Sequence, residues 1–334
     1  MKAVQFDRYG TPDVLVWRET VQPVCGPDEM LVRVSAAGVN PKDCLVRKGK
    51  FRWFSGRRFP LGLGHDFAGE VALVGGRVAG FKIGDPVYGM TNGWKGRTYA
   101  EYVAVRASET ALKPLALDFL EAAAVPLAAQ TALQALRDIG GVSRGQRVLI
   151  NGASGGVGTF AVQIARIMGA HVTAVCSGRN ASMVIDLGAQ QVIDYTREDI
   201  RQLDAPVDVF FDVFGNRRFP DIRATLSPRG CFISTVPGGP ILKWALLSRL
   251  SGGPRAHLVV VKSCADDLLT LSTWIEERRL TPVVDRVFAM EEVREAHAYI
   301  ETRRARGKVI LAPPDREPTE MQIQSPRNDD AQSF

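Results

Sequence analysis

Residues 147–169 read RVLINGASGGVGTFAVQIARIMG, and this stretch decides the fold. An apolar run of strand length, RVLIN, leads into a glycine-rich turn over 151–158, which opens an amphipathic helical run. Glycines permit a sharp strand-to-helix turn and let the backbone approach a diphosphate closely. The helix N-terminus adds unpaired N–H groups and a positive dipole end. The stretch therefore predicts a βαβ unit that binds a dinucleotide.

The turn has the pattern G-x-x-G-G-x-G, which departs from the more usual G-x-G-x-x-G. Its position between a strand and a helix makes it more specific than a lone glycine-rich loop. The hydroxyl of Ser154 can add a donor beside the backbone amides. We predict that the diphosphate contacts come from Gly152, Ser154, Gly155, Gly156 and Gly158.

The end of the next strand selects between the two nicotinamide dinucleotides. An NAD site places Asp or Glu there to bind the ribose 2′-hydroxyl. Here HVTAVC leads into Ser177-Gly178-Arg179-Asn180, a corner without a carboxylate. Ser, Arg and Asn can donate hydrogen bonds to a 2′-phosphate, and Arg adds charge. The sequence predicts NADPH as the cofactor; the alternative is that Arg179 simply faces solvent.

The order of predicted elements indicates an α/β protein. Short Val-, Tyr- and Phe-rich runs punctuated by Gly and Pro fill the first ~125 residues and predict a β-rich barrel or sandwich. After 145, near-continuous apolar strands alternate with helical runs, which predicts a doubly wound parallel sheet. Pro126 is expected to split the helical run 117–136 in two.

These patterns predict the domain organisation. A substrate domain is expected over 1–124, completed by about 266–312, and a nucleotide-binding domain over 125–265. Residues 237–257 are apolar and bounded by Gly and Pro, and they interrupt the alternation of strands and helices. We expect this segment to be a lid, a surface insertion or part of a dimer interface. Residues 313–334 are polar and predict a disordered tail.

Composition excludes several classes of protein. The 42 Lys and Arg against 36 Asp and Glu give a net charge of +6, but they are scattered, which argues against a nucleic-acid partner. The sequence contains no run of about 18 apolar residues, so no membrane span is predicted. Five widely spaced cysteines form no CxxC pair, and the N-terminus lacks a secretory signal. A reducing cytoplasm is the expected compartment.

Several further stretches resemble the medium-chain dehydrogenase/reductase superfamily, in its zinc-independent quinone oxidoreductase (zeta-crystallin-like) branch, similar to reductases of the reticulon-interacting and chloroplast envelope type. The resemblance covers nearly everything up to Leu311. Its motifs are GVNPKD (38–43), GHDFAG (64–69), AAVPLAAQTA (123–132), NGASGGVG (151–158), VIDY (192–195) and ARGKVI (305–310).

The resemblance implies a GroES-like catalytic domain built from both chain ends, a Rossmann domain between them, and an active site in the cleft where they meet. It also implies cofactor contacts from Ser154, Gly156, Val157, Ser177 and Tyr195, with Arg179 and Asn180 near the 2′-phosphate and Thr131 opposite the nicotinamide. The resemblance also implies a homodimer formed through strands of the Rossmann domain, as is common in this family.

A catalytic zinc is not expected. Such a site needs about three protein ligands. The zinc-dependent branch has Cys where this chain has Asn40; His65 is present, but no Cys or Glu occurs in 123–132 for a third ligand. The four-cysteine lobe of a structural zinc is also missing, since residues 89–103 contain no Cys. No metal ligand is predicted, and His65 is expected to be structural or to line the pocket.

Without a metal, reduction of an activated C=C bond is the favoured chemistry, because hydride addition to an enone or quinone develops charge on a delocalised enolate oxygen that a few donors can stabilise. The expected substrate is a small quinone or α,β-unsaturated carbonyl compound. Candidate pocket residues are Asn40, Lys42 and His65, followed by Asp43 and Tyr88. Two alternatives remain open: an enoyl-thioester or aldehyde/alcohol reductase, and a non-catalytic NADPH-binding adaptor.

Overall fold

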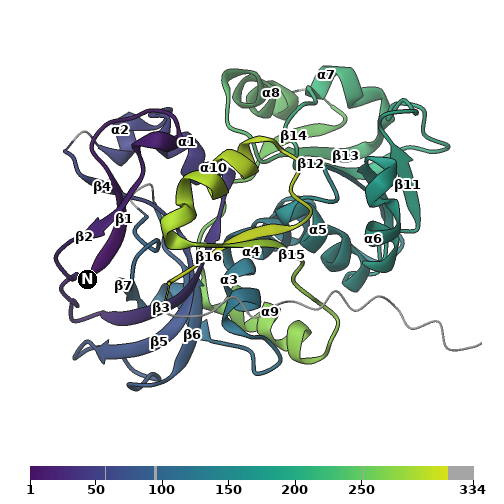
Figure 1. The fold of residues 1–334 in the computed structure, drawn as a ribbon. Coiled ribbons are helices and arrows are strands. Elements are labelled where there is room, and N and C mark those ends of the chain that lie inside the picture. The colour runs from purple at the N-terminus through teal and green to yellow at the C-terminus, as the bar shows by residue number, and fades with distance from the viewer. Residues whose placement is uncertain (57, 94–95, 251, 315–334) are drawn as a thin grey trace, which may run out of the picture.

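Two lobes, each built on its own sheets, make up the protein (Figure 1). The computed structural model describes residues 1–56, 58–93, 96–250 and 252–314. The predicted disordered tail, 313–334, lies outside the described residues from 315 onward. No helix within the described ranges is long and apolar enough to cross a membrane.

A six-stranded parallel sheet forms the centre of the second lobe, in the order β11-β10-β9-β12-β13-β14. Its strands are β9 (Arg147–Asn151), β10 (His171–Cys176), β11 (Gln191–Asp194), β12 (Val207–Asp212), β13 (Leu226–Ser234) and β14 (Arg255–Leu258). The chain turns from β9 to β10 on one side and reaches β12 on the other. Ligands of such sheets bind at this reversal, beside the carboxyl ends of the strands. The predicted doubly wound fold is confirmed.

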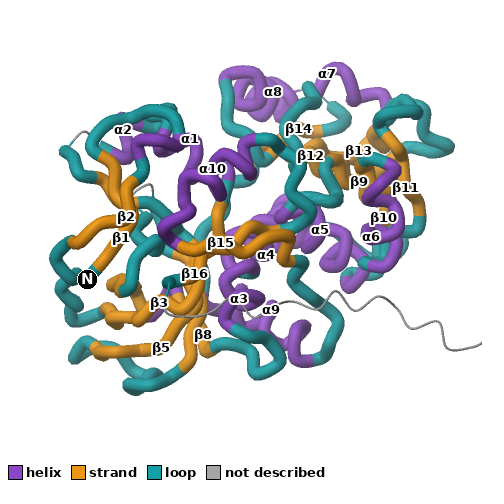
Figure 2. The backbone as a smooth tube through the Cα atoms, in the orientation of Figure 1, coloured by secondary structure: helices purple, strands orange, loops and turns teal. Residues whose placement is uncertain are grey.

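Helices cover both faces of this sheet because its buried strands are apolar on both sides (Figure 2). In β9, Val148 and Ile150 pack into the core on the side of α5, whereas Leu149 packs with residues of α7 and α8. The covering helices are α5 (Gly156–Ile167), α6 (Ala181–Asp186), α7 (Phe219–Ile222) and α8 (Gly239–Leu250).

The segment 237–257 is a regular part of the sheet rather than an interruption. Its apolar middle forms α8, and its end forms β14, which pairs in parallel with β13 from Cys231↔Arg255 onward. Ser248 Oγ accepts a hydrogen bond from the Ala256 amide across 3.0 Å and ties the helix to the strand. The expectation of a break in the α/β rhythm was therefore wrong, because the Gly/Pro pairs merely bound a further helix–strand unit.

The first lobe carries a seven-stranded sheet in the order β15-β16-β3-β5-β6-β8, with β7 also paired to β3. Its strands are β3 (Glu29–Val39), β5 (Asp66–Val74), β6 (Pro86–Met90), β7 (Tyr102–Arg106), β8 (Thr110–Leu112), β15 (Val284–Ala289) and β16 (Lys308–Ala312). Strand β16 pairs antiparallel with β3, so the C-terminal part of the chain completes a sheet begun near the N-terminus. A small antiparallel sheet lies beside it, formed by β1 (Lys2–Phe6), β2 (Val16–Glu19) and β4 (Leu61–Gly62).

Helices connect the lobes and close the first one. Pro126 separates α3 (Phe119–Ala124) from α4 (Pro126–Gln134), as predicted. Asp118 caps α3: its Oδ1 accepts from the Glu121 amide across 2.8 Å. The remaining helices are α1 (Pro41–Arg47), α2 (Arg52–Ser55), α9 (Ala265–Glu276) and α10 (Val293–Glu301). Buried residues of α3, α4, β5 and the parallel sheet share one apolar core, which runs from one lobe into the other.

Candidate active site

The glycine-rich turn lies at the carboxyl end of β9, where the sheet order reverses. Gly152 has φ +87°, a conformation that favours glycine. A Cβ on Gly158 would stand 2.1 Å from the Gly152 carbonyl oxygen, so this first turn of α5 admits no side chain there. The first amides of α5 have no carbonyl one turn earlier, because the helix has just begun. The turn therefore brings backbone amides without intrahelical partners to the carboxyl end of β9, which is the geometry that the predicted diphosphate site requires.

Two of the predicted cofactor residues meet at this turn. Asn180 Nδ2 donates to Ser154 Oγ across 3.0 Å, which joins the turn to the corner after β10. Asn180 is buried, and its Oδ1 has no hydrogen-bond partner among the described residues. A buried amide oxygen without a partner is costly. It fits a site in which a hydroxyl or N–H group of a bound molecule donates the missing hydrogen bond.

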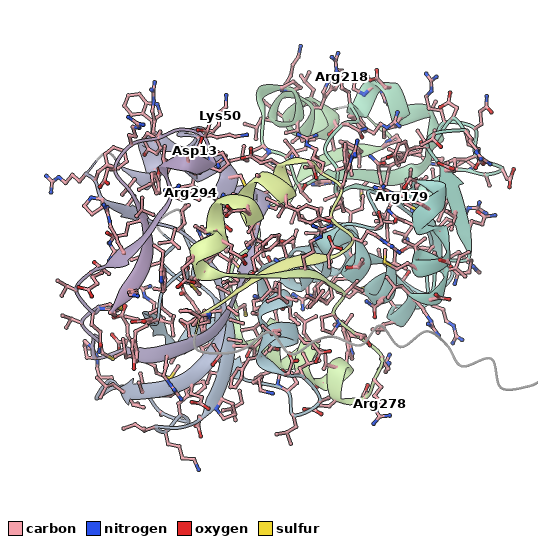
Figure 3. The ribbon with its side chains drawn as sticks, in the orientation of Figure 1. Asp13, Lys50, Arg179, Arg218, Arg278 and Arg294 are labelled. Carbon is pink, nitrogen blue, oxygen red and sulfur yellow. The ribbon has the colours of Figure 1, made fainter. Side chains whose placement is uncertain are left out.

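The corner after β10 is open to a negatively charged group. Arg179 is exposed and forms no hydrogen bond or ion pair within the described part of the chain. Figure 3 places it on the lobe of the parallel sheet, away from Arg294 of α10. Ser177 is half-buried, and Tyr195, at the end of β11, is exposed. Ser177, Arg179 and Tyr195 are therefore accessible side chains at the carboxyl ends of β10 and β11.

One carboxylate stands closer to this corner than the sequence suggested. Asp194 lies opposite Cys176 in the β10–β11 pair. Its Oδ2 is 2.6 Å from the position of a Cβ on Gly178. Hydrogen bonds from the hydroxyl and amide of Thr196, and one from the Gly178 amide, hold the pKa of Asp194 below its usual value. Asp194 therefore braces the corner as an anion, and Arg197, whose Nε lies 3.9 Å from Asp194 Oδ2, is its ionic partner.

The C-terminal loop before β16 contacts the turn from the other lobe. The Gly307 amide donates to the Ser154 carbonyl across 3.0 Å, and Gly155 and Gly307 form an isolated parallel bridge. The guanidinium of Arg303 lies 5.3 Å from the centre of the Phe214 ring, next to Gly152. The turn is therefore held between the lobes by contacts from both of them.

A buried polar cluster lies directly behind this contact. Lys308 Nζ donates to Asn40 Oδ1 across 2.6 Å and to Asp66 Oδ2 across 2.9 Å. Asn40 Nδ2 donates to the same Asp66 oxygen across 2.9 Å. The other Asp66 oxygen accepts from the Leu127 amide across 2.7 Å, near the start of α4. Both ends of the Asn40 amide are therefore occupied within the protein.

A second cluster shares the start of α1 with the first. Asp43 Oδ1 lies 2.7 Å from His65 Nδ1, and Asp43 Oδ2 accepts from Tyr99 Oη across 2.7 Å and from the Asn40 amide across 2.9 Å. Burial raises the pKa of Asp43, but the hydrogen bonds from His65 and Tyr99 outweigh it, and the net pKa lies below its usual value. Asp43 is an ionised structural residue that orders the start of α1.

His65 is fully buried between acceptors. Its Nε2 lies 3.2 Å from the Gly93 carbonyl oxygen, while Nδ1 faces Asp43. Lys42 Nζ donates to the same carbonyl across 2.6 Å. Burial lowers the pKa of Lys42, against the opposing effect of the Asp43 and Asp66 charges. Of the three predicted catalytic residues, Asn40 and His65 are buried and Lys42 is half-buried.

Two other candidates are engaged elsewhere. Tyr88 donates from its hydroxyl to the Leu268 carbonyl and contacts Ser272 Oγ, both in α9 and both at 2.8 Å. The structure therefore does not bring Tyr88 to the Asn40 cluster. The Thr131 hydroxyl donates to the Leu127 carbonyl across 2.6 Å, within α4. The Thr131 hydroxyl has therefore used its donor and can still accept a hydrogen bond through its oxygen.

Within the described residues, no three side chains of His, Cys, Asp or Glu lie together as a metal ion would require. Cys44 has His297 Nδ1 at 3.5 Å from its Sγ, and both side chains are buried. Burial, together with the Asp43 charge, raises the pKa of this thiol strongly. Cys44 is therefore a protonated core residue.

Sequence reasoning missed Lys308, the most central charge of the site. It stands in the stretch 305–310, which was noticed for its resemblance only. The pairing of β16 with β3 brings Lys308 opposite Asn40, 268 residues away along the chain. No local pattern reports such a contact. The signal available in the sequence was a lysine at the start of an apolar run of strand length, KVILA.

Known proteins resemble the chain along most of its length. Residues 26–115 match the alcohol dehydrogenase GroES-like domain, and 187–311 match the zinc-binding dehydrogenase domain. The 2-methylene-furan-3-one reductase of Solanum lycopersicum is 34% identical over 94% of this chain and 79% of its own length. The mitochondrial NAD(P)H oxidoreductase RTN4IP1 of Homo sapiens is 33% identical over 93% of this chain and 89% of its own length. The structure of the quinone oxidoreductase from Coxiella burnetii superposes with a TM-score of 0.85, at 34% identity, over 93% of this chain and 99% of that one.

Proposed function

Because the chain belongs to the medium-chain dehydrogenase/reductase superfamily, in its quinone oxidoreductase branch, and is an NAD(P)H-dependent oxidoreductase, we propose that it uses NADPH to reduce quinones or α,β-unsaturated carbonyl compounds without a catalytic zinc. The observation that carries this proposal is the turn 152–158, joined through Ser154 to Asn180 beside the unpaired Arg179.

We propose that the backbone of Ser154–Gly158 binds the diphosphate and that Ser177, Arg179 and Asn180 bind the 2′-phosphate, with Tyr195 at its edge. Arg179 supplies the charge-assisted bond that distinguishes NADPH from NADH. Thr131 and Val157 are placed on the nicotinamide side in this proposal. When bound, the nicotinamide supplies the hydride, and the protein orients the dinucleotide and stabilises charge at the substrate oxygen.

The catalytic roles divide by exposure. Asn40 and His65 are buried and hydrogen-bonded within the protein, so in this proposal they order the segments that carry them rather than contact the substrate. Lys42 is half-buried and hydrogen-bonds the carbonyl that His65 also faces, and its lowered pKa fits a donor toward the developing enolate oxygen. The proposed substrate domain is 1–124, completed by about 266–312, and the proposed nucleotide-binding domain is 125–265.

The substrate class has independent support from the relatives. The name of the tomato enzyme specifies a ketone with an adjacent exocyclic C=C bond, and the Coxiella burnetii protein is titled a quinone oxidoreductase. Both substrate classes, the unsaturated ketone and the quinone, accept hydride at an electron-poor C=C or carbonyl group. The enoyl-thioester and aldehyde or alcohol readings, and the non-catalytic adaptor, are the alternatives. The expected cytoplasmic location and homodimer stay predictions.

A substrate panel tests the proposal. Purified protein is mixed with NADPH and, separately, a quinone, an enone, an enoyl-CoA and an aldehyde, and the loss of NADPH absorbance is followed. Fastest turnover is expected with the quinone or the enone. Turnover of the enoyl-CoA or the aldehyde alone would reassign the substrate class, and tight NADPH binding without turnover would favour the adaptor.

A further inference from the structure

Lys308 is a buried cation placed where four segments meet. Only 3% of the residue is exposed. It begins β16, whose pairing with β3 places it beside Asn40, the residue that opens α1. Asp66, its ionic partner, begins β5, and through the Leu127 amide the same carboxylate holds the start of α4. One ammonium therefore fixes the relative positions of α1, β5 and α4.

The backbone and stem of Lys308 reach the dinucleotide turn as well. Gly307, the preceding residue, donates to the Ser154 carbonyl. A Cβ on Gly156 would stand 2.9 Å from Lys308 Cδ, so the lysine stem packs against the first residue of α5. The side chain thus spans the distance between the cradle of the diphosphate and the polar wall formed by Asn40 and Asp66.

Stability alone is a poor reason for this arrangement. A buried ion pair gives up the hydration of both ions, and apolar residues of similar volume often replace such pairs without loss of stability. The ammonium also uses its donors selectively: one holds the Asn40 oxygen and one holds Asp66. As a result the Asn40 amide has one orientation, with its nitrogen toward Asp66.

We propose that Lys308 is a positioning residue that transmits the geometry of the dinucleotide turn to the Asn40–Asp66 wall of the substrate pocket. The inference rests on the proposed function, because the wall matters only if a substrate meets the nicotinamide there. Loading the cofactor onto α5 fixes the Gly155–Gly307 contact, and Lys308 then holds α1 and α4 in register with it. A misplacement of about 1 Å between reacting groups can cost a large factor in rate.

The test separates this role from stability with two matched double variants. Lys308→Met/Asp66→Asn and Lys308→Gln/Asp66→Asn both remove the two charges together, so neither leaves a buried ion unpaired. They differ in one respect: Gln, although one atom shorter than Lys, keeps a donor for Asn40 Oδ1, and Met keeps none. Lys82→Met, at an exposed site, is the control and is expected to behave as the parent.

Three readouts are taken at a temperature where all variants are folded. The Met/Asn variant is expected to bind NADPH within about threefold of the parent. Its kcat for an enone or quinone is expected to fall about tenfold or more, with a larger primary isotope effect from NADPH deuterated at C4. NADPH is expected to slow hydrogen exchange in residues 38–47 of the parent and to leave it unchanged in this variant. The Gln/Asn variant is expected to recover most of the rate and of the NADPH-dependent protection.

Some outcomes overturn the inference. A Met/Asn variant with the parental kcat, isotope effect and NADPH-dependent protection would do so, as would a Gln/Asn variant that loses as much rate and protection as the Met/Asn variant. A parent that binds no dinucleotide would remove both the inference and the proposed function. If the parent reduces nothing but shows protection of 38–47 that the Met/Asn variant loses, the proposed function fails, and only the coupling of the dinucleotide turn to residues 38–47 through Lys308 stands.

Discussion

Asn180 donates its side-chain amide to Ser154 Oγ across 3.0 Å, and this bond joins the two parts of the proposed cofactor site. Ser154 belongs to the turn after β9, and Asn180 to the corner after the neighbouring strand β10. In the proposed site, the turn binds the diphosphate and the corner binds the 2′-phosphate. Preference for NADPH and affinity for any nicotinamide dinucleotide can therefore be tested separately.

Arg179→Ala tests the preference. Loss of its guanidinium is expected to weaken NADPH binding by about 1–3 kcal/mol and to leave NADH nearly unchanged, since only NADPH carries the 2′-phosphate. Dissociation constants measured from the fluorescence of each reduced dinucleotide give the comparison. Arg229→Ala, at another exposed arginine, serves as the control. Equal weakening of both dinucleotides, or tighter binding of NADH by the parent, would contradict the assignment to the 2′-phosphate.

Gly158→Ala tests the affinity. The added methyl group would stand 2.1 Å from the Gly152 carbonyl oxygen, so the turn must open. Both dinucleotides are expected to bind at least about tenfold more weakly, because the amides of the turn lose their shared direction. Gly239→Ala is the control, since a Cβ there meets no atom within 4 Å. Dinucleotide affinity that survives in Gly158→Ala would place the diphosphate elsewhere.

The sequence predicts the features that local chemistry determines. The strand, turn and helix over 147–167 follow from a run of adjacent residues, and so does the break at Pro126. The segment 237–257 was misjudged because a short helix and an edge strand between Gly/Pro pairs have no distinctive period. Its place in the sheet depends on β13, which the segment itself does not reveal.

The charges of the site were harder to predict because partners lie far apart along the chain. Asp194 comes to the corner at Gly178 only through the register of β10 and β11. Lys308 meets Asp66, 242 residues away, only after β16 joins β3. The motifs containing Asn40 and His65 did point to one place. Their roles as buried, hydrogen-bonded residues depend on partners that no motif contains.

Asp43→Asn and Tyr99→Phe test the cluster at the start of α1. Asp43 accepts hydrogen bonds from His65, Tyr99 and the Asn40 amide, and an amide side chain would turn its NH₂ group toward one of these donors. Asp43→Asn is expected to lower the free energy of unfolding by about 3–5 kcal/mol. Tyr99→Phe removes one bond to a charged group and is expected to cost about 2 kcal/mol. Urea unfolding followed by circular dichroism measures both, and equal effects of the two variants would contradict the central role of the carboxylate.

His297 predicts how stability responds to acid. Burial is the largest effect on this ring, and it lowers the pKa to about 4 in the folded protein, against a usual value of 6.5. Asp43 and Glu301 act against the shift, whereas Arg47 adds to it. The unfolded chain therefore binds more protons than the folded protein between these two values. The contribution of His297 to stability is complete above pH 6.5 and is lost as the pH falls toward 4, by about 3 kcal/mol in all.

His297→Gln removes this titration while keeping a polar side chain of similar size. Urea unfolding of the parent and the variant between pH 7.5 and pH 4 (about one measurement per half unit) gives the difference in unfolding free energy at each pH. In the parent, the unfolded chain takes up a proton at His297 as the pH falls from 6.5 to 4, whereas the variant has no such group. The parent is therefore expected to lose stability faster than the variant across this window. His171→Gln, at an exposed histidine, is the matched control substitution. Parallel curves for the parent and His297→Gln would mean that the folded protein and the unfolded chain bind protons at His297 equally, and the lowered pKa of this ring would be contradicted.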